Sequence, residues 1–326
     1  MTWRIVRLVV QYGLVLFAAA ALNFALPRLA PGDVTDYLIP PEQAGAITAE
    51  QRERILARYG LDEPLPVQFR EYLAGLVRGD LLISARYSRP VTDIVLERLP
   101  WTLLLVGTST LLAVAVGTAA GFRSAWKRGR ATDVSTMSTF MLIDSMPPFF
   151  VGLLLILVFS VHLGWFPIFG AVPTLPTEGV ELVVEVARRL ILPALSLTAA
   201  MLGTIYLVAR PALVSELRED YVLMAQAKGL TKRQVRRHAE RNALLPVTTM
   251  ALINLGTVVG GATVIETVFS YPGLGRLLYE SVLARDYPVL QGTFFVLAVT
   301  VLAANFVADL LYPLLDPRVR RPFASP

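Results

Sequence analysis

The strongest constraint on this sequence is a set of six long apolar stretches. An α-helix needs about 20 residues to cross roughly 30 Å of hydrocarbon. Only 17% of the residues are charged and 55% are hydrophobic, whereas soluble chains carry about 25% charged residues. We therefore predict an all-α integral membrane protein with about six transmembrane helices, at residues 5–26, 101–122, 138–161, 190–212, 245–268 and 289–315.

Two of these stretches have features of their own. The fifth contains Asn254 and several threonines and glycines, including Gly256 and Gly260. Small and polar residues of this kind favour contact with other helices or with a pathway over contact with lipid. The first stretch has Arg4 and Arg7 at its start, as a signal peptide would, but its apolar run is longer than the ~7–15 residues typical of one. We therefore expect it to remain as a transmembrane helix.

The distribution of basic residues orients the predicted helices. In a six-helix arrangement Lys127, Lys228 and Lys232 all fall in loops on one side, which also holds both chain termini. Short loops rich in Lys and Arg stay in the cytoplasm. Both termini are therefore predicted to be cytoplasmic.

This orientation divides the chain into four parts. They are the cytoplasmic N-terminus with the first helix (1–30), an extracytoplasmic helical segment (31–99), a core (100–315) that includes the cytoplasmic loop 213–244, and a cytoplasmic tail (316–326). In the external segment Thr48 and Gln51 form a capping box, and residues 67–77 have apolar side chains at helical spacing. Because about 70 residues offer only a small core, we expect two or three short helices there rather than a separate domain.

The residue patterns of common catalytic and metal sites are absent from the sequence. There is no cysteine, and the two histidines, His162 and His238, lie far apart, which argues against a metal cluster. No Gly-Lys precedes Ser or Thr, as an ATP-binding P-loop requires, and no Gly-x-Ser-x-Gly occurs. We predict no catalytic residue, no metal ligand and no enzymatic activity in this chain.

The cytoplasmic loop 216–241 begins with the pattern of a short amphipathic helix. Leu217, Tyr221, Met224 and Ala225 recur at helical spacing and form an apolar stripe. Glu216, Glu219 and Asp220 lie near the start of this helix and Lys228 at its end, as the helix dipole favours. We expect the stripe to face the cytoplasm.

A tight turn and a second helix follow. Gly229 can adopt the positive φ that ends a helix. Thr231 and Gln234 form a capping box for the next helix, which runs towards Pro246. The loop is therefore predicted to be helix, turn and helix.

Three functions fit such a loop. A DNA-binding helix-turn-helix has the same rhythm and charge, but both ends of this loop enter the membrane, so we expect no nucleic-acid partner. A loop that rests on lipid headgroups explains the charge but neither the apolar stripe nor the glycine turn. A docking helix for a partner protein explains the charge, the apolar stripe and the glycine turn, and is favoured.

Segments along most of the chain resemble one transporter family. These are PGDV (31–34), RYGLDEPLPVQ (58–68), GDL (79–81), RPVTDIVLERLPWTL (89–103), SMPPFFVGLLLILVFS (145–160), LGWFPIFG (163–170), DYVLMAQAKGL (220–230), RNALLP (241–246), ETVFSYPGLGRLLYESVLARDYPVLQG (266–292) and DLLYPLLDPRV (309–319). They are similar, in order, to permease subunits of ATP-binding-cassette (ABC) importers, in the oligopeptide and dipeptide form. The loop resembles the cytoplasmic EAA loop of that family.

The sequence departs from the family pattern at a few positions. Leu223, Met224 and Ala225 occupy the place of the motif that contains the glutamate for which the EAA loop is named. Val34 stands where proline is common, and Leu82 where glycine is common. These differences concern the details of docking rather than the resemblance itself.

The resemblance implies a type I ABC importer permease in the bacterial inner membrane. Its partners would be a second homologous permease, two cytoplasmic ATP-binding subunits, an extracytoplasmic solute-binding lipoprotein and membrane lipids. This chain would bind no cofactor, because ATP and Mg²⁺ belong to the partner subunits. The loop would supply the coupling helix that docks on the ATPase, through Glu216, Asp220, Tyr221, Met224, Ala225, Lys228, Gly229 and Leu230.

Ionisable residues within predicted transmembrane helices are candidates for a translocation pathway, because they are costly in lipid. Asp144 precedes Pro147 and Pro148, where we expect a kink, and either lines the pathway or pairs with a neighbouring helix. Glu266 precedes a helix-breaking segment that acts either as a gate or as a structural turn. The gate candidates in that segment are Pro272, Gly273 and Gly275.

The substrate implied by the resemblance is a di- or oligopeptide. The same architecture also fits import of a nickel chelate, glutathione or an oligosaccharide. A membrane-tethered receptor or regulator is the alternative from another class, but it requires a signalling domain that we do not find in this sequence.

Overall fold

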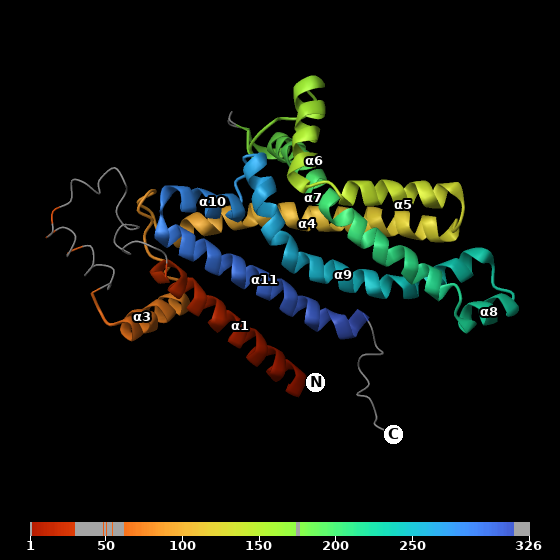
Figure 1. Cartoon of the computed structure of the whole chain (residues 1–326), viewed down its shortest axis with the longest axis horizontal. Coiled ribbons are helices and arrows are strands. Elements are labelled where there is room, and N and C mark those ends of the chain that lie inside the picture. The colour runs from red at the N-terminus through yellow and green to blue at the C-terminus, as the bar shows by residue number, and fades with distance from the viewer. Residues whose placement is uncertain are drawn as a thin grey trace. The chain divides into compact units, whose positions relative to one another are not determined.

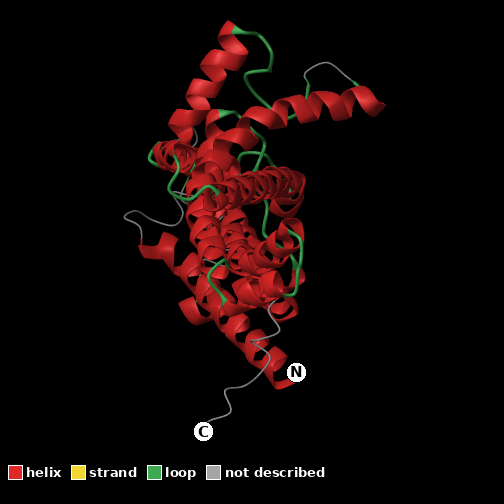
Figure 2. Ribbon diagram, turned by 90° about the vertical axis from the view of Figure 1, so that its right-hand side faces the viewer, coloured by secondary structure: helices red, strands yellow, loops and turns green. Residues whose placement is uncertain are grey.

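The computed structural model describes residues 2–29, 48, 50, 54, 62–173 and 177–315, and these are almost entirely helical (Figure 2). The β-type contact found among them is an isolated bridge between Ile83 and Pro90. The predicted all-α architecture is therefore confirmed for this part of the chain. Gln51 of the first capping box, the segment 31–47 and the tail 316–326 lie outside the described residues.

The chain divides into two compact units, and the first contains Met1–Thr102 and Pro272–Ala303. It is built from α1 (Thr2–Leu29), α3 (Leu65–Arg78), the start of α4 (Val91–Trp126), α10 (Leu274–Ala284) and most of α11 (Tyr287–Leu315) (Figure 1). α3 is the helix predicted from the spacing of residues 67–77. It packs on α1, with the rings of Phe24 and Phe69 5.1 Å apart.

Buried polar contacts hold the first unit together. The side-chain amide of Asn23 donates to the backbone oxygen of Gln291 at 2.9 Å, and that of Gln291 donates to the backbone oxygen of Asn23 at 3.1 Å. The buried carboxylate of Asp286 accepts hydrogen bonds from the Ser84 hydroxyl and from the Arg86 N–H. These bonds satisfy polar groups that would otherwise be costly away from water.

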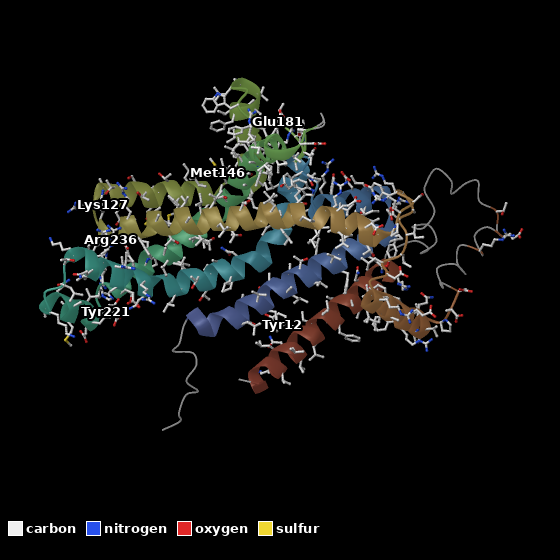
Figure 3. All side chains as sticks on the ribbon, turned by 180° about the vertical axis from the view of Figure 1, so that it is seen from behind. Tyr12, Lys127, Met146, Glu181, Tyr221 and Arg236 are labelled. Carbon is white, nitrogen blue, oxygen red and sulfur yellow. The ribbon has the colours of Figure 1, made fainter. Side chains whose placement is uncertain are left out.

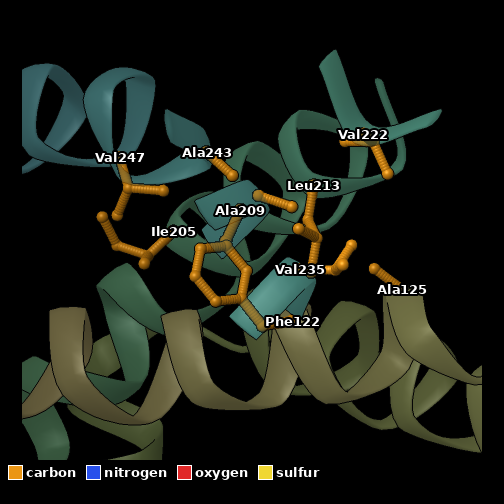
Figure 4. Close-up of a cluster of buried hydrophobic side chains, with 10 residues drawn as sticks. Phe122, Ala125, Ile205, Ala209, Leu213, Val222, Val235, Ala243 and Val247 are labelled. Carbon is orange, nitrogen blue, oxygen red and sulfur yellow. The ribbon is translucent and has the colours of Figure 1, made fainter. Parts of the chain in front are cut away.

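The second unit contains Leu103–Tyr271 and Ala304–Pro326. Its helices are the rest of α4, α5 (Ala131–Asp144), α6 (Pro148–Leu155), the π-helix η2 (Ile156–His162), α7 (Gly179–Glu216), α8 (Asp220–Ala227) and α9 (Lys232–Val268). α7 contacts α5, α6 and α9. Apolar side chains from α4, α7, α8 and α9 form a buried cluster (Figure 4), which contains Phe122, Ala125, Ile205, Ala209, Leu213, Val222, Val235, Ala239, Ala243 and Val247.

Four helices among the described residues are long and apolar enough to cross a membrane. They cover Val6–Ala25, Val91–Trp126, Gly179–Glu216 and Tyr287–Leu310. A fifth crossing arises if the bent pair Ala131–Asp144 and Pro148–His162 forms one span. The remaining predicted span, 245–268, lies within α9. The described residues of α9 do not form one of the four long apolar helices.

The kink expected at Pro147 and Pro148 is larger than a simple bend in one helix. α5 ends at Asp144, and the axis turns by 98° before α6 begins at Pro148. Proline lacks an N–H donor and its ring clashes with the preceding turn, so two consecutive prolines stop the first helix. Pro148 then occupies the first position of the next helix, where its missing N–H costs little.

Glycines of α4 allow a close contact with α7 in the second unit. A Cβ on Gly117 would lie 2.8 Å from Cγ2 of Ile205, and one on Gly121 would lie 2.9 Å from Cβ of Ala209. A Cβ on Gly260, by contrast, would meet nothing within 4 Å. Among the glycines whose surroundings the structure describes, Gly117 and Gly121 therefore bring two helices together at four-residue spacing, whereas Gly260 makes no such contact.

Gly121→Ala should destabilise the second unit by roughly 1–2 kcal/mol, because the added methyl group overpacks the contact with Ala209. Gly107→Ala on the same helix is the matched control, since a Cβ there meets nothing within 4 Å and alanine favours the helix. Thermal melting of each purified variant in the same detergent measures the difference. Equal midpoints for the two variants would contradict the close contact.

Candidate functional site

The two-helix loop predicted at residues 216–241 forms one end of the second unit. α7 ends at Glu216, α8 (Asp220–Ala227) follows, and α9 begins at Lys232. Figure 3 shows Tyr221 and Arg236 from this loop at the same end as Lys127 from the turn after α4. α8 is therefore a short helix held at both ends by long helices of 38 and 37 residues.

The turn after α8 has a fixed hydrogen-bond pattern. Gly229 has φ +76°, the left-handed conformation predicted for it. The N–H of Leu230 donates to the Ala225 oxygen at 3.2 Å, and the N–H of Gly229 donates to the Gln226 oxygen at 2.9 Å. This is the Schellman motif, which satisfies the free carbonyl groups at the end of a helix.

The capping box predicted at the start of α9 is confirmed. The Gln234 N–H donates to the Thr231 hydroxyl at 3.4 Å, and the Thr231 N–H donates to the Gln234 side-chain oxygen at 2.9 Å. Turn and cap follow each other directly, so the backbone between α8 and α9 has little freedom to change direction.

The apolar stripe predicted to face outward from α8 does so at Met224 but not at Leu217, Tyr221 and Ala225. Leu217, Tyr221, Ala225 and Leu230 are partly buried and pack against the apolar cluster that includes Leu213, Val235 and Ala239. α8 is only eight residues long and lies against α9, so its more continuous apolar side faces the protein. The side chains that face outward are Leu223 and Met224, which are 63% and 60% exposed.

Tyr221 anchors α8 to the end of α7. Its hydroxyl donates to the Glu216 carboxylate at 2.6 Å. Burial, followed by this hydrogen bond, raises the pKa of Tyr221 to about 12, so the hydroxyl keeps its proton at physiological pH. Glu216 is thus engaged within the chain, while Asp220 and Lys228 at the two ends of α8 are exposed.

A buried polar network that sequence reasoning missed lies in the same unit. The Arg210 guanidinium donates from Nε and Nη2 to the two carboxylate oxygens of Asp133, both at 2.8 Å. Asp133 also accepts from the Gly129 N–H at 2.9 Å and from the Ser124 hydroxyl, which lies 2.7 Å from the Tyr206 hydroxyl. Arg210 falls inside the predicted span 190–212, so the rule that drew attention to Asp144 would also have identified it.

The structure places the pathway candidates in different environments. Asp144 is exposed at the end of α5, and a Cβ on Gly203 of α7 would lie 2.3 Å from its Oδ1. Glu266 has no exposed surface, so its side chain lines no open surface of this chain. Pro272, Gly273 and Gly275 belong to the first unit, where the backbone N–H of Leu274 donates to the Thr102 hydroxyl at 2.8 Å.

The glycines of the helix-breaking segment do not supply its unusual backbone conformation. Gly273 has φ −94°, which any residue adopts, whereas the positive φ of +50° belongs to Ser270.

Among the described residues, no three His, Asp or Glu side chains gather where they could hold a metal ion.

Comparison with known proteins gives consistent matches. Residues 113–321 match the model of a family described as binding-protein-dependent transport system inner membrane component. The oligopeptide transport system permease protein AppB of Bacillus subtilis is 37% identical over 307 residues, which are 94% of this chain and 95% of that protein. The di/tripeptide transport system permease protein DppB of Pseudomonas aeruginosa is 38% identical, over 93% of this chain and 94% of that protein.

Two further matches extend the comparison. The glutathione transport system permease protein GsiC of Escherichia coli is 38% identical over 94% of this chain and 94% of its own length. Among solved structures, a chain of the inward-facing MetNI methionine ABC transporter matches with a TM-score of 0.54 and 19% identity. That match covers 68% of this chain and 96% of the other, and it shows a shared fold.

Gly229→Val should loosen the end of α8, because a β-branched residue is strained at φ +76° by roughly 1–2 kcal/mol. Space is not limiting, since a Cβ at this position meets nothing within 4 Å. Gly229→Asn is the matched control, because asparagine tolerates the left-handed region. Amide hydrogen exchange at residues 225–231 should be about tenfold faster in the valine variant than in the asparagine variant. Equal exchange in the two variants would contradict the role of backbone conformation.

Proposed function

The chain belongs to the family of binding-protein-dependent transport system inner membrane components, and on that basis we propose that it forms half of the translocation pathway of a peptide importer. It is a multi-pass membrane protein and the permease subunit of an ABC importer, a family that works with an ATPase and a solute-binding protein. The structural observation that supports coupling to an ATPase is the fixed, two-turn helix α8, which presents Leu223 and Met224 outward between two long helices.

Peptides are the substrate class that the relatives favour. Two relatives that match nearly the whole chain are named for oligopeptides and di/tripeptides. Glutathione is the second candidate, since a relative of equal identity is named for it and glutathione is itself a tripeptide. The membrane subunit would provide a pathway for either, with the substrate delivered by a solute-binding lipoprotein at the outer face.

The proposed assembly contains a second, homologous permease and two cytoplasmic ATP-binding subunits, which carry the ATP and Mg²⁺. Both chain termini and the loop 216–241 would lie in the cytoplasm, as the distribution of lysines favours. α8 would dock on one ATPase, with Leu223 and Met224 as apolar anchors and Asp220 and Lys228 at the rim. Tyr221, Ala225 and Leu230 would support the helix from behind rather than touch the ATPase.

ATP-driven movement of the ATPases would reach the membrane through α7 and α9. The Schellman turn and the capping box restrict the backbone at one end of α8, and the bond from Tyr221 to Glu216 restrains the other. Such restraints favour rigid-body movement of the attached helices, which is how alternating access is achieved in many transporters.

The double variant Leu223→Asp, Met224→Asp should abolish docking, because two carboxylates would have to be buried in an apolar contact. Co-purification of the ATPases with the permease pair should fall at least tenfold, as expected when central anchors are lost, and peptide uptake into proteoliposomes should fall with it. Val180→Asp is the matched control, since Val180 is 81% exposed at the start of α7, on the side predicted to be extracytoplasmic. ATPase recovery that equals the control would refute docking through α8.

Asp144 is proposed to line the pathway and to attract the positively charged amino terminus of a peptide. Asp144→Asn should lower peptide uptake about tenfold, the effect of losing roughly 1.4 kcal/mol of attraction, while ATPase recovery stays at the wild-type level. Gly203→Ala should have a similar effect, because its methyl group would displace the carboxylate. Wild-type uptake by both variants would remove Asp144 from the pathway.

A further inference from the structure

We call the polar network of Ser124, Gly129, Asp133, Tyr206 and Arg210 the Asp133 junction. It connects three helices of the second unit and the turn between two of them. Ser124 lies near the end of α4, Gly129 in the following turn, Asp133 in the first turn of α5, and Tyr206 and Arg210 in α7. Asp133 is the buried residue of α5, at 3% exposed. This end of α5 is therefore attached to the protein through a carboxylate rather than through an apolar side chain.

The geometry of the junction leaves little freedom between α5 and α7. Each carboxylate oxygen of Asp133 accepts one hydrogen bond from Arg210 and one more, from Ser124 or from Gly129. A bidentate pair of this kind fixes the relative orientation of both side chains. Stacking of the Phe140 and Tyr206 rings, 4.8 Å apart, continues the contact along the same two helices.

The energetics of a buried ion pair indicate a role in orientation. Desolvation offsets much of the attraction between buried charges, and apolar pairs of similar volume often stabilise a protein equally well. The pair at Asp133 is therefore poorly explained by stability. What it supplies, and apolar side chains do not, is a directional connection between α7 and the turn at the start of α5.

The Asp133 junction lies between the docking helix α8 and the bent helix pair. α7 connects it to α8, and α5 connects it to the bend. Arg210 lies ten residues before the start of α8 in the chain, on the helix to which Tyr221 fastens α8 through Glu216. From Asp133, α5 continues to its last residue, Asp144, where the 98° break begins. Movement of α7 therefore has a rigid connection to the broken segment through Asp133.

A second, exposed connection joins the end of α4 to α9. The Trp126 indole N–H and the Arg236 Nε both donate to Oε1 of Glu240, at 3.1 and 2.7 Å. The Arg236–Glu240 ion pair lies within α9, so the hydrogen bond from Trp126 is what links the two helices here. Because this hydrogen bond is exposed to solvent, the connection is the weaker of the two. It offers a matched control close to the junction.

We infer that Arg210 and Asp133 are positioning residues that pass the movement of the docking helix from α7 to α5, and so couple ATP hydrolysis to opening of the pathway. This inference rests on the proposed function, because it assigns to the junction a step within ATP-driven import. It predicts that loss of the bidentate pair separates ATP hydrolysis from transport while the assembled complex persists.

The test uses the whole complex in proteoliposomes with peptide-loaded binding protein, and measures peptide imported per ATP hydrolysed. Arg210→Lys keeps the charge but loses the bidentate geometry, and should lower this ratio about tenfold with ATPase recovery and hydrolysis retained. Glu240→Gln should leave the ratio unchanged. The inference would be overturned if Arg210→Lys imported as much peptide per ATP as the wild type. It would also be overturned if ATPase recovery, ATP hydrolysis and peptide uptake all fell together while this ratio stayed constant.

A second variant guards against loss of folding. Asp133→Leu combined with Arg210→Met replaces the pair by apolar side chains and is expected to fold, yet it should show the same low ratio. Amide exchange gives an independent measure: ATP should alter protection of α5 in the wild-type complex, but only of residues 213–244 in the double variant. If the double variant imported as much peptide per ATP as the wild type, or if ATP altered the protection of its α5 as in the wild type, the inference would be overturned and the proposed function would stand. Failure of the wild-type chain to recover ATPases would instead overturn the proposed function.

Discussion

The close approach of α4 to α7 at Gly117 and Gly121 is the constraint on which the end of the second unit that carries α8 depends. Because these positions carry no side chain, Ile205 and Ala209 lie directly against the α4 backbone. The same approach places Ser124 beside Tyr206 and brings Arg210 to Asp133. Bulkier residues on α4 would separate the helices, and the polar groups of the junction would lose both their partners and their shielding from water.

Rigidity at α8 arises from local backbone chemistry supported by packing. The left-handed glycine, the two bonds of the Schellman motif and the capping box determine how the chain leaves α8 and enters α9. Val222 and the partly buried Tyr221 and Ala225 then hold the helix on the apolar cluster. The exposed side consequently presents Leu223 and Met224 between the charged residues Asp220 and Lys228.

Much of the architecture follows from the sequence because it depends on local properties. Apolar length predicted the long helices, two consecutive prolines predicted the break after Asp144, and glycine and threonine predicted the turn and cap around Gly229. Three features were not predictable in this way. They are the size of the break, the side of α8 that faces outward, and the glycines that bring helices together. They depend on which surfaces of neighbouring helices meet, and the spacing at Gly256 and Gly260 looks the same in sequence as that at Gly117 and Gly121.

By itself, the sequence determined that this chain is a helical membrane protein with a capped helix-turn-helix loop, because apolar length, capping residues and glycine act within a few residues of one another. Its order of motifs also identified the transporter family. Only the tertiary structure decided that Tyr221 faces inward, that Leu223 joins Met224 on the outer side, and that Asp133 pairs with Arg210 across 77 residues of chain. Those choices are made by packing between helices distant in sequence, where the cost of a buried unpaired charge selects the partner.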